Sequence, residues 1–460
     1  MKRRVVAGLL ASVTAVTGCA MLSRDARPWK LQEAELIHSA MHQLTSVMVY
    51  DIFSPPQSSR VYAYASIAAY EVLRQEHPEY GTLAGQLNGL TPVPSADRTV
   101  QYSFPLAGVH ALMTVGRTLT FSRPRMDSLR TSMDARFRGH GMTAAVYDRS
   151  IAYGDTVARH ILAWASNDRF IQTRGYPKYT VISKPGRWIP TPPAYMDAVE
   201  PNWAVLRPFV MDSSSQLRPP APAEYDTTAG SVFRTNAMEV WDTARHLTDE
   251  QRAIAGFWDC NPYVMHVQGH AMFATKKISP GGHWMGIVAI ASRNAEADLM
   301  QSSEAYARTA VALADGFISV WDEKFRSNVV RPETAINSFL DEQWQPLLQT
   351  PPFPEYPSGH SVVSNAAATV LSQLFGARVA FVDSSEVEYG LPVRSFASFD
   401  AAAAEAAISR LYGGIHYRPA IEAGAVQGRR VGTLVNDRIH TRLGRVVTTA
   451  GTRPAAAPTH

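Results

Sequence analysis

Apolar residues recur along most of this chain at the spacing of a single helix face. Between positions 35 and 49 the residues that form such a stripe are Leu36, Met41, Leu44 and Met48. A spacing near 3.6 residues indicates an amphipathic helix, whereas strict alternation would indicate a half-buried strand. No convincing alternation extends beyond a few residues. We therefore expect an all-α fold.

The same pattern predicts further helices, and a proline-dense stretch from about 170 to 232 separates them into two sets. The expected helices are 58–73, 104–119, 126–137, 144–167, 249–258, 283–293, 296–324, 360–375, 399–412 and 418–437. We expect Pro55 and Pro56 to end the helix that precedes them, since proline cannot continue a helix. We expect two helical bundles joined by a proline-rich loop region, with the active site in the second bundle. The expected boundaries are 1–19 for a signal peptide, 20–170 and 249–445 for the bundles, 171–248 for the connection and 446–460 for a disordered tail.

The composition is that of a globular protein. Hydrophobic residues make up 46% of the 460 positions and charged residues 18%, so the chain can bury a large core. The formal net charge of +4 is small for this length. It gives no basic footprint for nucleic acid, and we expect no nucleic-acid partner.

Residues 1–19 have the features of a bacterial export signal. Positions 2–4 are Lys-Arg-Arg, and 5–17 form an apolar run too short to span a bilayer with ease. Cys19 ends this run as the cysteine of a lipobox does, so its thiol would take up lipid. We expect an exported lipoprotein, periplasmic or attached to the outer membrane, with the lipid anchor as its membrane contact. Loss of the three early cations would leave a net charge of +1. The alternative is an ordinary secretory signal with a chance cysteine.

The second cysteine, Cys260, begins a pattern that could be mistaken for a zinc site. Cys260-x5-His266-x3-His270 would place two histidines one helical turn apart near a thiol, and another His-x3-His pair begins at His38. The segment lacks the glutamate that a zinc protease needs beside its first histidine. Structural zinc is the weaker interpretation. The stronger one gives Tyr263, His266 or His270 a place at the entrance or second shell of another site.

Three short motifs in the last third of the chain carry the groups that would bind an oxyanion. They are Lys324-x6-Arg331-Pro332, Pro357-Ser358-Gly359-His360 and Ser409-Arg410-x5-His416. Cations gathered around one point are costly unless an anion neutralises them, and guanidinium groups match the oxygens of a tetrahedral oxyanion. Ser358 and Gly359 precede an expected helix, whose first N–H groups favour an anion. The histidines are suited to ligation and to acid–base chemistry.

The three motifs, in this order and with these spacings, resemble the signature shared by vanadium-dependent haloperoxidases and bacterial acid phosphatases of the type-2 phosphatidic acid phosphatase superfamily. The Pro-Pro-Phe-Pro run at 351–354 and the Tyr-Gly-Gly-Ile-His-Tyr run at 412–417 resemble the haloperoxidase branch. The roughly 200 additional residues before the site also fit that branch, and the bacterial enzymes that act on iodide are similar in size and layout.

The resemblance implies a role for each motif residue. His416 would bond vanadium through a ring nitrogen. The vanadate oxygens would be held by Lys324, Arg331, Ser358, Gly359 and Arg410. His360 would hydrogen-bond the axial oxygen and help to move protons, and Lys324 would polarise bound peroxide. The products would be hypohalous acid or an equivalent, formed from halide and hydrogen peroxide, and no haem, flavin or nicotinamide is required. The resemblance leaves open whether a small organic acceptor exists.

Two aromatic residues, Trp321 and Phe353, resemble positions that line the halide pocket of the family, and Tyr263 is a third candidate. The alternative for each is ordinary core packing. Overall likeness favours iodide, with bromide next. Two other functions stay open: a phosphoric ester hydrolase with a phosphohistidine intermediate at His416, and a lipid-anchored protein that only binds the anion.

Overall fold

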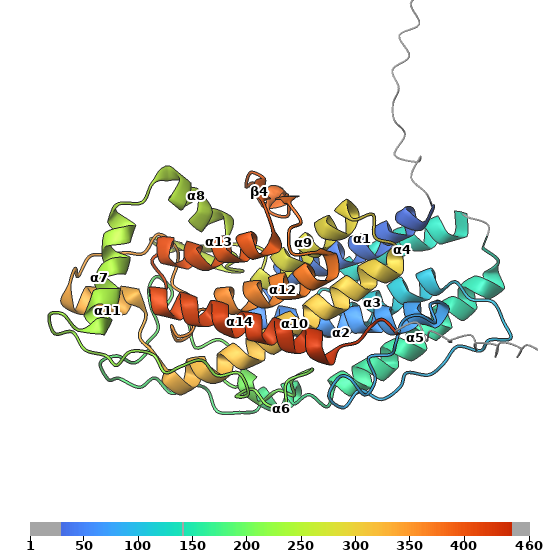
Figure 1. The fold of residues 1–460 in the computed structure, drawn as a ribbon, viewed down its shortest axis with the longest axis horizontal. Coiled ribbons are helices and arrows are strands. Elements are labelled where there is room, and N and C mark those ends of the chain that lie inside the picture. The colour runs from blue at the N-terminus through green and yellow to red at the C-terminus, as the bar shows by residue number, and fades with distance from the viewer. Residues whose placement is uncertain (1–28, 140–141, 444–460) are drawn as a thin grey trace, which may run out of the picture.

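The computed structural model describes residues 29–139 and 142–443, and these form an elongated, mostly helical molecule (Figure 1). The helices are α1 (Trp29–Tyr50), α2 (Pro55–Leu73), α3 (Phe104–Leu119), α4 (Arg123–Gly139), α5 (Ala144–Ala165), α6 (Phe170–Thr173), α7 (Val232–Arg245), α8 (Asp249–Phe257), α9 (Pro280–Asn294), α10 (Leu299–Ser327), α11 (Pro332–Phe339), α12 (Gly359–Phe375), α13 (Phe399–Tyr412) and α14 (Arg418–Arg438). The prediction of an all-α fold is confirmed. The expected signal segment and tail lie outside the described residues.

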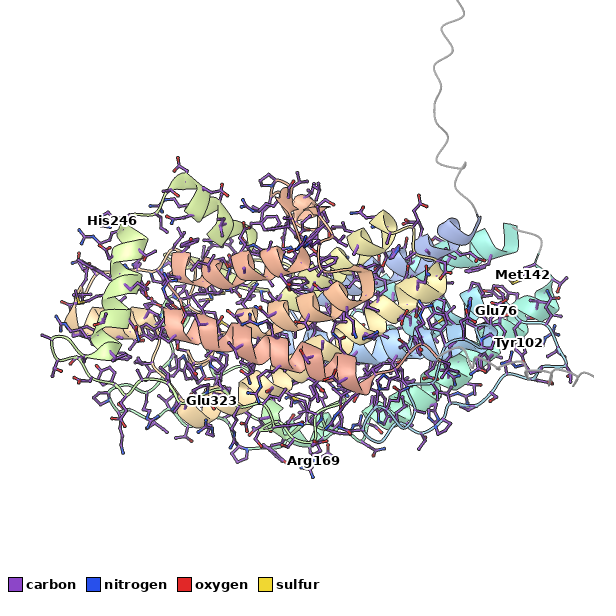
Figure 2. All side chains as sticks on the ribbon, in the orientation of Figure 1. Glu76, Tyr102, Met142, Arg169, His246 and Glu323 are labelled. Carbon is purple, nitrogen blue, oxygen red and sulfur yellow. The ribbon has the colours of Figure 1, made fainter. Side chains whose placement is uncertain are left out.

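Helix α10 is the central element of the molecule. It packs against α2 from the N-terminal group of helices, α1–α5, and against α12 from the C-terminal group, α12–α14. Helix α12 in turn packs against α13 and α14. In Figure 1, α12, α13 and α14 lie side by side, away from α4 and α5. The largest cluster of buried apolar side chains includes residues from both groups. Figure 2 shows side chains filling the space between these helices. The boundaries between two bundles stay a prediction.

Side-chain caps fix where several helices begin. Ser54 accepts from the Gln57 amide at the start of α2, and Asp298 forms a reciprocal capping box with Gln301 at the start of α10. Pro55 is part of α2, so the expectation that Pro55 and Pro56 end the preceding helix is wrong. Proline is tolerated in a first helical turn, where its missing N–H has no intrahelical partner in any case.

Two short hairpins interrupt the helical pattern. Strands β1 (Val264–Gln268) and β2 (Ala271–Thr275) pair antiparallel, with His266 opposite Phe273, and β3 (Phe381–Asp383) pairs with β4 (Arg394–Phe396). The helical placement of His266 and His270 is therefore wrong. Five-residue strands are too short to distinguish from a helix by periodicity alone. The helices α7 and α11 were also not expected.

The proline-rich region runs as irregular chain across the helices. From residue 174 to 231 its one helical element is the 3-10 turn η3 (Trp203–Val205). The Asp315 carboxylate of α10 accepts the backbone amides of Phe209, Val210 and Met211, at 2.6–3.1 Å, and so holds this region against the core. No helix in the described ranges is long and apolar enough to cross a membrane.

Candidate active site

The fold brings all three motifs to one place. Lys324 lies in the last turn of α10, Arg331 caps α11, and Ser358 caps α12. Arg410 lies in the last turn of α13, and His416 follows in the connection to α14. The helix ends converge because α12 packs against α10, α13 and α14. Five successive elements of the fold thus contribute to one site.

His416 is held as a neutral ligand with one ring nitrogen facing the cations. Its Nδ1 lies 2.8 Å from Glu355 Oε1, and its Nε2 lies 3.1 Å from Arg331 Nη1. Burial lowers the pKa of His416 well below its ordinary value, and the nearby Arg331 and Lys324 lower it further. The proton therefore belongs on Nδ1, where Glu355 accepts it, and the Nε2 lone pair accepts from Arg331 Nη1, a hydrogen bond that a ligand at Nε2 would replace.

Glu355 is a functional residue that the sequence analysis missed. Its Oε1 accepts from the Tyr417 amide at 3.0 Å as well as from His416, so one carboxylate oxygen fixes the connection between α13 and α14. Burial raises its pKa to about 7, against the influence of Arg331 and Lys324. A metal-binding histidine commonly donates its second N–H to a carboxylate. That requirement could have directed attention to a carboxylate close to the second motif.

We expect ¹⁵N NMR of the vanadate-free protein to show His416 as the neutral Nδ1–H tautomer at pH 6. An unperturbed imidazole, with a pKa of about 6.5, would be mostly protonated at that pH. The downward shift of the His416 pKa keeps the ring neutral at pH 6. A protonated His416 ring at pH 6 would contradict this geometry.

Arg331 is a buried cation with a free donor. Its Nε donates to the Phe353 carbonyl at 2.9 Å and its Nη1 to the Ile415 carbonyl at 2.8 Å. Nη2 is buried and has no hydrogen-bond partner among the described residues. Burial lowers the pKa of Arg331 to about 10. A buried guanidinium with an unsatisfied N–H is costly, and an anion beside Nη2 would remove that cost.

Lys324 is fully buried, and backbone carbonyls take up all of its donors. Its Nζ donates to Pro354 O at 2.9 Å, Glu355 O at 3.1 Å and Pro357 O at 2.6 Å. An ammonium group has three donors, so direct contact with an oxyanion requires the exchange of one carbonyl. Lys324 thus fixes the 354–357 loop and contributes positive charge, while its expected direct bond to the anion stays a prediction.

The start of α12 presents one hydroxyl donor. Ser358 Oγ accepts from the Ser361 amide at 3.3 Å and from the Ser361 hydroxyl at 2.9 Å, so its own proton can be donated elsewhere. A Cβ at Gly359 would meet Lys324 Cε at 3.6 Å, an ordinary contact distance. The Lys324 side chain therefore borders the space beside Gly359. An anion at the start of α12 would lie next to this cation.

His360 and Arg410 complete the polar wall. His360 Nε2 is buried without a partner in the described structure, and burial lowers the pKa of this ring well below its ordinary value, with Arg410 adding to the effect. Arg410 donates to Ser409 Oγ at 2.9 Å and to the Trp258 carbonyl. Both side chains border the same cavity as His416.

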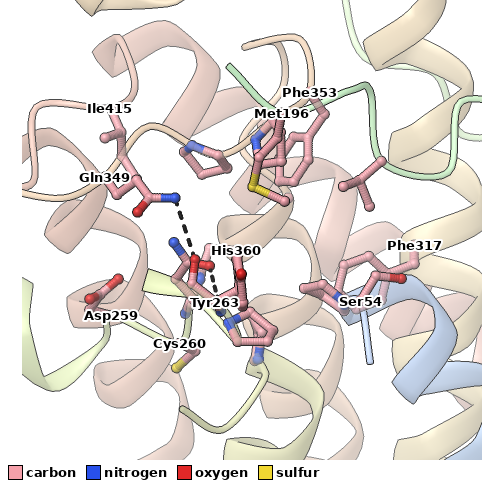
Figure 3. A pocket seen from close by; sticks show the side chains of 18 of the residues that line it. Ser54, Met196, Asp259, Cys260, Tyr263, Phe317, Gln349, Phe353, His360 and Ile415 are labelled. Atoms are coloured by element: carbon pink, nitrogen blue, oxygen red, sulfur yellow. Dashed lines mark hydrogen bonds between the residues drawn. The ribbon is translucent and has the colours of Figure 1, made fainter. Parts of the chain in front are cut away.

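A cavity of about 300 Å³ opens beside His360 and His416, and most of its remaining lining is apolar (Figure 3). Trp321, Phe353 and Tyr263 all line it, and their role in a halide pocket stays a prediction. The rings of Trp321 and Phe353 lie 4.9 Å apart, and Phe353 also lies 5.1 Å from Lys324 Nζ. Figure 3 shows Tyr263 close to His360 and joined by a hydrogen bond to Gln349.

The two histidines of the apparent zinc pattern lie elsewhere. His266 Nε2 bonds Thr275 Oγ1 at 3.0 Å, its ring stacks on Phe273, and His270 is exposed at the hairpin turn. Neither is among the residues that line the cavity, so their expected place at its entrance is not supported. Cys260 does line it.

An all-helical fold with buried cations, a neutral histidine held by a carboxylate and unsatisfied donors is the arrangement that an oxyanion-binding enzyme requires. A family model of the second helical-bundle domain of vanadium chloroperoxidase matches residues 304–444. Among solved structures, a bacterial vanadium-dependent iodoperoxidase is 48% identical, with a TM-score of 0.85, over 90% of this chain and 98% of that one. A bacterial vanadium-dependent chloroperoxidase in its holo form shares the fold at 18% identity, with a TM-score of 0.64, over 84% of this chain and 93% of that one. The search of curated proteins finds no match.

This chain belongs to the family of vanadium-dependent haloperoxidases, because its 48% identity to the iodoperoxidase extends over nearly the whole of both chains.

Proposed function

We propose that this protein binds vanadate and oxidises halide, iodide first, with hydrogen peroxide. The observation that carries the proposal is the convergence of His416 Nε2 with two buried atoms that have no partner in the described structure, the donor Arg331 Nη2 and the ring nitrogen His360 Nε2. In the overall reaction, halide, hydrogen peroxide and one proton give hypohalous acid and water.

The residues present fit vanadate. A tetrahedral oxyanion would accept hydrogen bonds from Arg331 Nη2 and the Ser358 hydroxyl. Its negative charge would also neutralise the buried cations, whose charged forms are otherwise disfavoured by loss of hydration. His416 would offer the nitrogen that binds the metal, and Arg410 and the start of α12 would hold the vanadate oxygens. When bound, vanadate supplies a Lewis-acidic centre that activates hydrogen peroxide towards halide without a change in oxidation state.

The protein residues divide the remaining work. Glu355 holds the proton of His416 on Nδ1, so that Nε2 keeps its lone pair for binding. His360 is neutral because burial lowers its pKa, so its ring can take up the proton that hydrogen peroxide loses and later return it. Lys324 and Arg331 keep the site positive, which favours the approach of anionic halide.

The apolar side of the cavity supports the choice of halide. A large, weakly hydrated halide loses little hydration energy when it enters the apolar space beside Trp321 and Phe353. The two rings also exclude water from the oxidised product. The 48% identical relative is an iodoperoxidase by its description, and this favours iodide over bromide. Product analysis would show whether the oxidised halide reacts with an organic acceptor.

A paired assay on the full chain tests the proposal. One arm follows oxidation of iodide and of bromide with hydrogen peroxide, with and without orthovanadate; the other follows hydrolysis of a chromogenic phosphate ester without vanadate. We expect vanadate-dependent oxidation, faster with iodide. Efficient ester hydrolysis with no peroxide-driven halide turnover would assign the pocket to phosphate, and anion binding without turnover would leave only a binding protein.

We expect Glu355→Gln to weaken vanadate binding roughly 10–100-fold, as loss of a carboxylate that orients a metal-binding histidine usually does. Glutamine keeps an acceptor for Nδ1–H but removes the charge that makes Nε2 a better donor to the metal. Isothermal titration with vanadate measures the change. Glu304→Gln is the control, because this buried carboxylate lies on α10 about 30 Å from Lys324. Equal affinities in both variants would remove Glu355 from the binding machinery.

From positions 2–19 alone we propose export with lipid attachment at Cys19. Mass spectrometry of the mature protein would find a modified N-terminal cysteine. A mature chain that retains residues 2–18 would contradict export, and an unmodified start would leave simple secretion.

A further inference from the structure

A second cluster of polar side chains lies behind the cavity wall, where the end of α8, the start of α9 and the β3–η4 segment meet, η4 being the 3-10 turn Val387–Tyr389. Its members are Cys260, His283, Asp383 and Glu386, each at most 3% exposed. None of them belongs to the oxyanion motifs. They come from three separate parts of the sequence, so local structure does not explain why they meet.

Three of these side chains direct a ligand atom at one point. Cys260 Sγ lies 3.4 Å from His283 Nδ1, His283 Nδ1 lies 3.0 Å from Glu386 Oε1, and Glu386 Oε1 lies 3.9 Å from Cys260 Sγ. A thiol, an imidazole nitrogen and a carboxylate oxygen are the three protein ligands of zinc.

The spacing of the three atoms fits a tetrahedral ion. Zinc bonds of about 2.3 Å to sulfur and 2.0–2.2 Å to nitrogen and oxygen place tetrahedral ligand atoms roughly 3.4–3.6 Å apart. Each of the observed separations differs from that range by about 0.4 Å or less. Small side-chain rotations therefore suffice for ligation, without movement of the backbone.

The far side of His283 is also arranged as in metal sites. Its Nε2 lies 2.8 Å from Asp383 Oδ2, and the other Asp383 oxygen accepts from the Ser385 amide at 3.0 Å and its hydroxyl at 2.6 Å. A carboxylate that accepts the second N–H of a ligating histidine fixes the ring and raises its basicity. Asp383 thus orients Nδ1 towards Cys260 and Glu386.

We propose that Cys260 Sγ, His283 Nδ1 and Glu386 Oε1 bind one divalent transition-metal ion of the zinc class, separate from the vanadate site. Water supplies the fourth ligand. Binding of the ion displaces the thiol proton of Cys260 and the proton on His283 Nδ1, so a thiolate and a carboxylate balance its two positive charges and His283 is left neutral.

The ion would join the β3–η4 segment to the start of α9 and to the segment around Cys260, and the last two of these reach the cavity lining. Trp258 stacks on His283 with ring centroids 4.4 Å apart, and its other neighbours include His360, at 6.4 Å. Arg410 donates to the Trp258 carbonyl. A fixed Cys260–His283–Glu386 unit thereby holds Trp258, and with it the apolar surroundings of His360. The role of the ion is structural, and it takes no part in the proposed halide oxidation.

The direct test uses the full chain, stripped with chelator and kept free of vanadate, and titrates it with Zn²⁺ and with Co²⁺. We expect one tight equivalent of either ion. Co²⁺ should produce tetrahedral d–d bands together with a thiolate-to-cobalt charge-transfer band, and Zn²⁺ should raise the unfolding temperature. None of these readouts requires enzymatic activity, so their outcome does not depend on whether the proposed function is correct.

Matched variants identify the site. The chain has two cysteines, so Cys19→Ser should retain the charge-transfer band and Cys260→Ser should lose it. Asp383→Asn should keep the band but weaken Co²⁺ binding roughly 10–100-fold. His270→Ala removes an exposed histidine and should change nothing, which separates the site from adventitious surface binding.

The wild-type titration alone can overturn the proposal, even if a variant fails to fold. Less than about half an equivalent of Co²⁺, or binding without a thiolate band, would mean that the cluster is only a hydrogen-bonded core. Retention of the band in folded Cys260→Ser protein, or its loss in Cys19→Ser, would exclude Cys260 as a ligand.

Discussion

Replacement of His416 by alanine is expected to lower vanadate-dependent halide oxidation by about 10³-fold or more. Loss of one preorganised donor to a transition state already costs roughly 10²–10³-fold. In the proposed function His416 would supply the bond to the metal itself, through the Nε2 atom that faces Arg331. Initial rates of iodide oxidation at saturating vanadate measure the change.

The His416 experiment needs a check on folding, since alanine leaves Glu355 Oε1 with the Tyr417 amide as its remaining partner. Circular dichroism and thermal unfolding provide that check. His270→Ala is the matched control: this exposed histidine lies outside the cavity lining, and its removal should leave the rate unchanged. Activity within tenfold of wild type in folded His416→Ala protein would refute the proposed role.

The motifs could be recognised in the sequence because each residue type has a chemical reason to be there. The arginines match an oxyanion, and Ser358 precedes a helix whose first turn faces the site. Glu355 could not be assigned in the same way. Any buried carboxylate close to His416 in the folded protein could accept the proton of its Nδ1. Separation along the sequence does not show which carboxylate is close, since Glu355 and His416 are 61 residues apart.

The helices were predictable where apolar spacing persisted over several turns. The prediction of 104–119 matches α3 and that of 399–412 matches α13. Failures came where local signals conflict or are short. The β1–β2 hairpin is held by tertiary contacts such as the Met265 amide to Gln349 Oε1, at 2.7 Å, and no window of sequence contains both partners. Helix α11 has only eight residues, less than a reliable periodic signal requires.

The buried polar residues divide into those already satisfied and those that still need a ligand. Lys324 has its three donors on carbonyl oxygens. Arg331 Nη2 and His360 Nε2 have no partner in the described structure. Sequence alone places Lys324 and Arg331 in one class, as anion-binding cations. The geometry separates them, and it makes Arg331 the cation on which anion binding depends most directly.

Replacement of Arg331 by methionine is therefore expected to weaken vanadate binding about 10²-fold or more, close to the cost of removing one preorganised donor. Thermal or denaturant unfolding with and without vanadate measures the loss as a change in stabilisation. At a vanadate concentration 100 times the wild-type Kd, binding stabilises the wild-type protein by about 2.7 kcal/mol. A variant that binds 100-fold more weakly gains only about 0.4 kcal/mol under the same conditions.

The difference between liganded and free protein isolates binding from folding in this variant. Methionine leaves the Phe353 and Ile415 carbonyls without a donor, which lowers stability, but it also removes a buried charge, which raises it. Both effects are present with and without vanadate and cancel in the difference. Arg308→Met is the matched control, because Arg308 is a buried arginine on the same helix as Lys324, about 24 Å along its axis. It should lower baseline stability and retain the full vanadate effect. Should Arg331→Met retain it too, the unsatisfied guanidinium would not be the group that binds the anion.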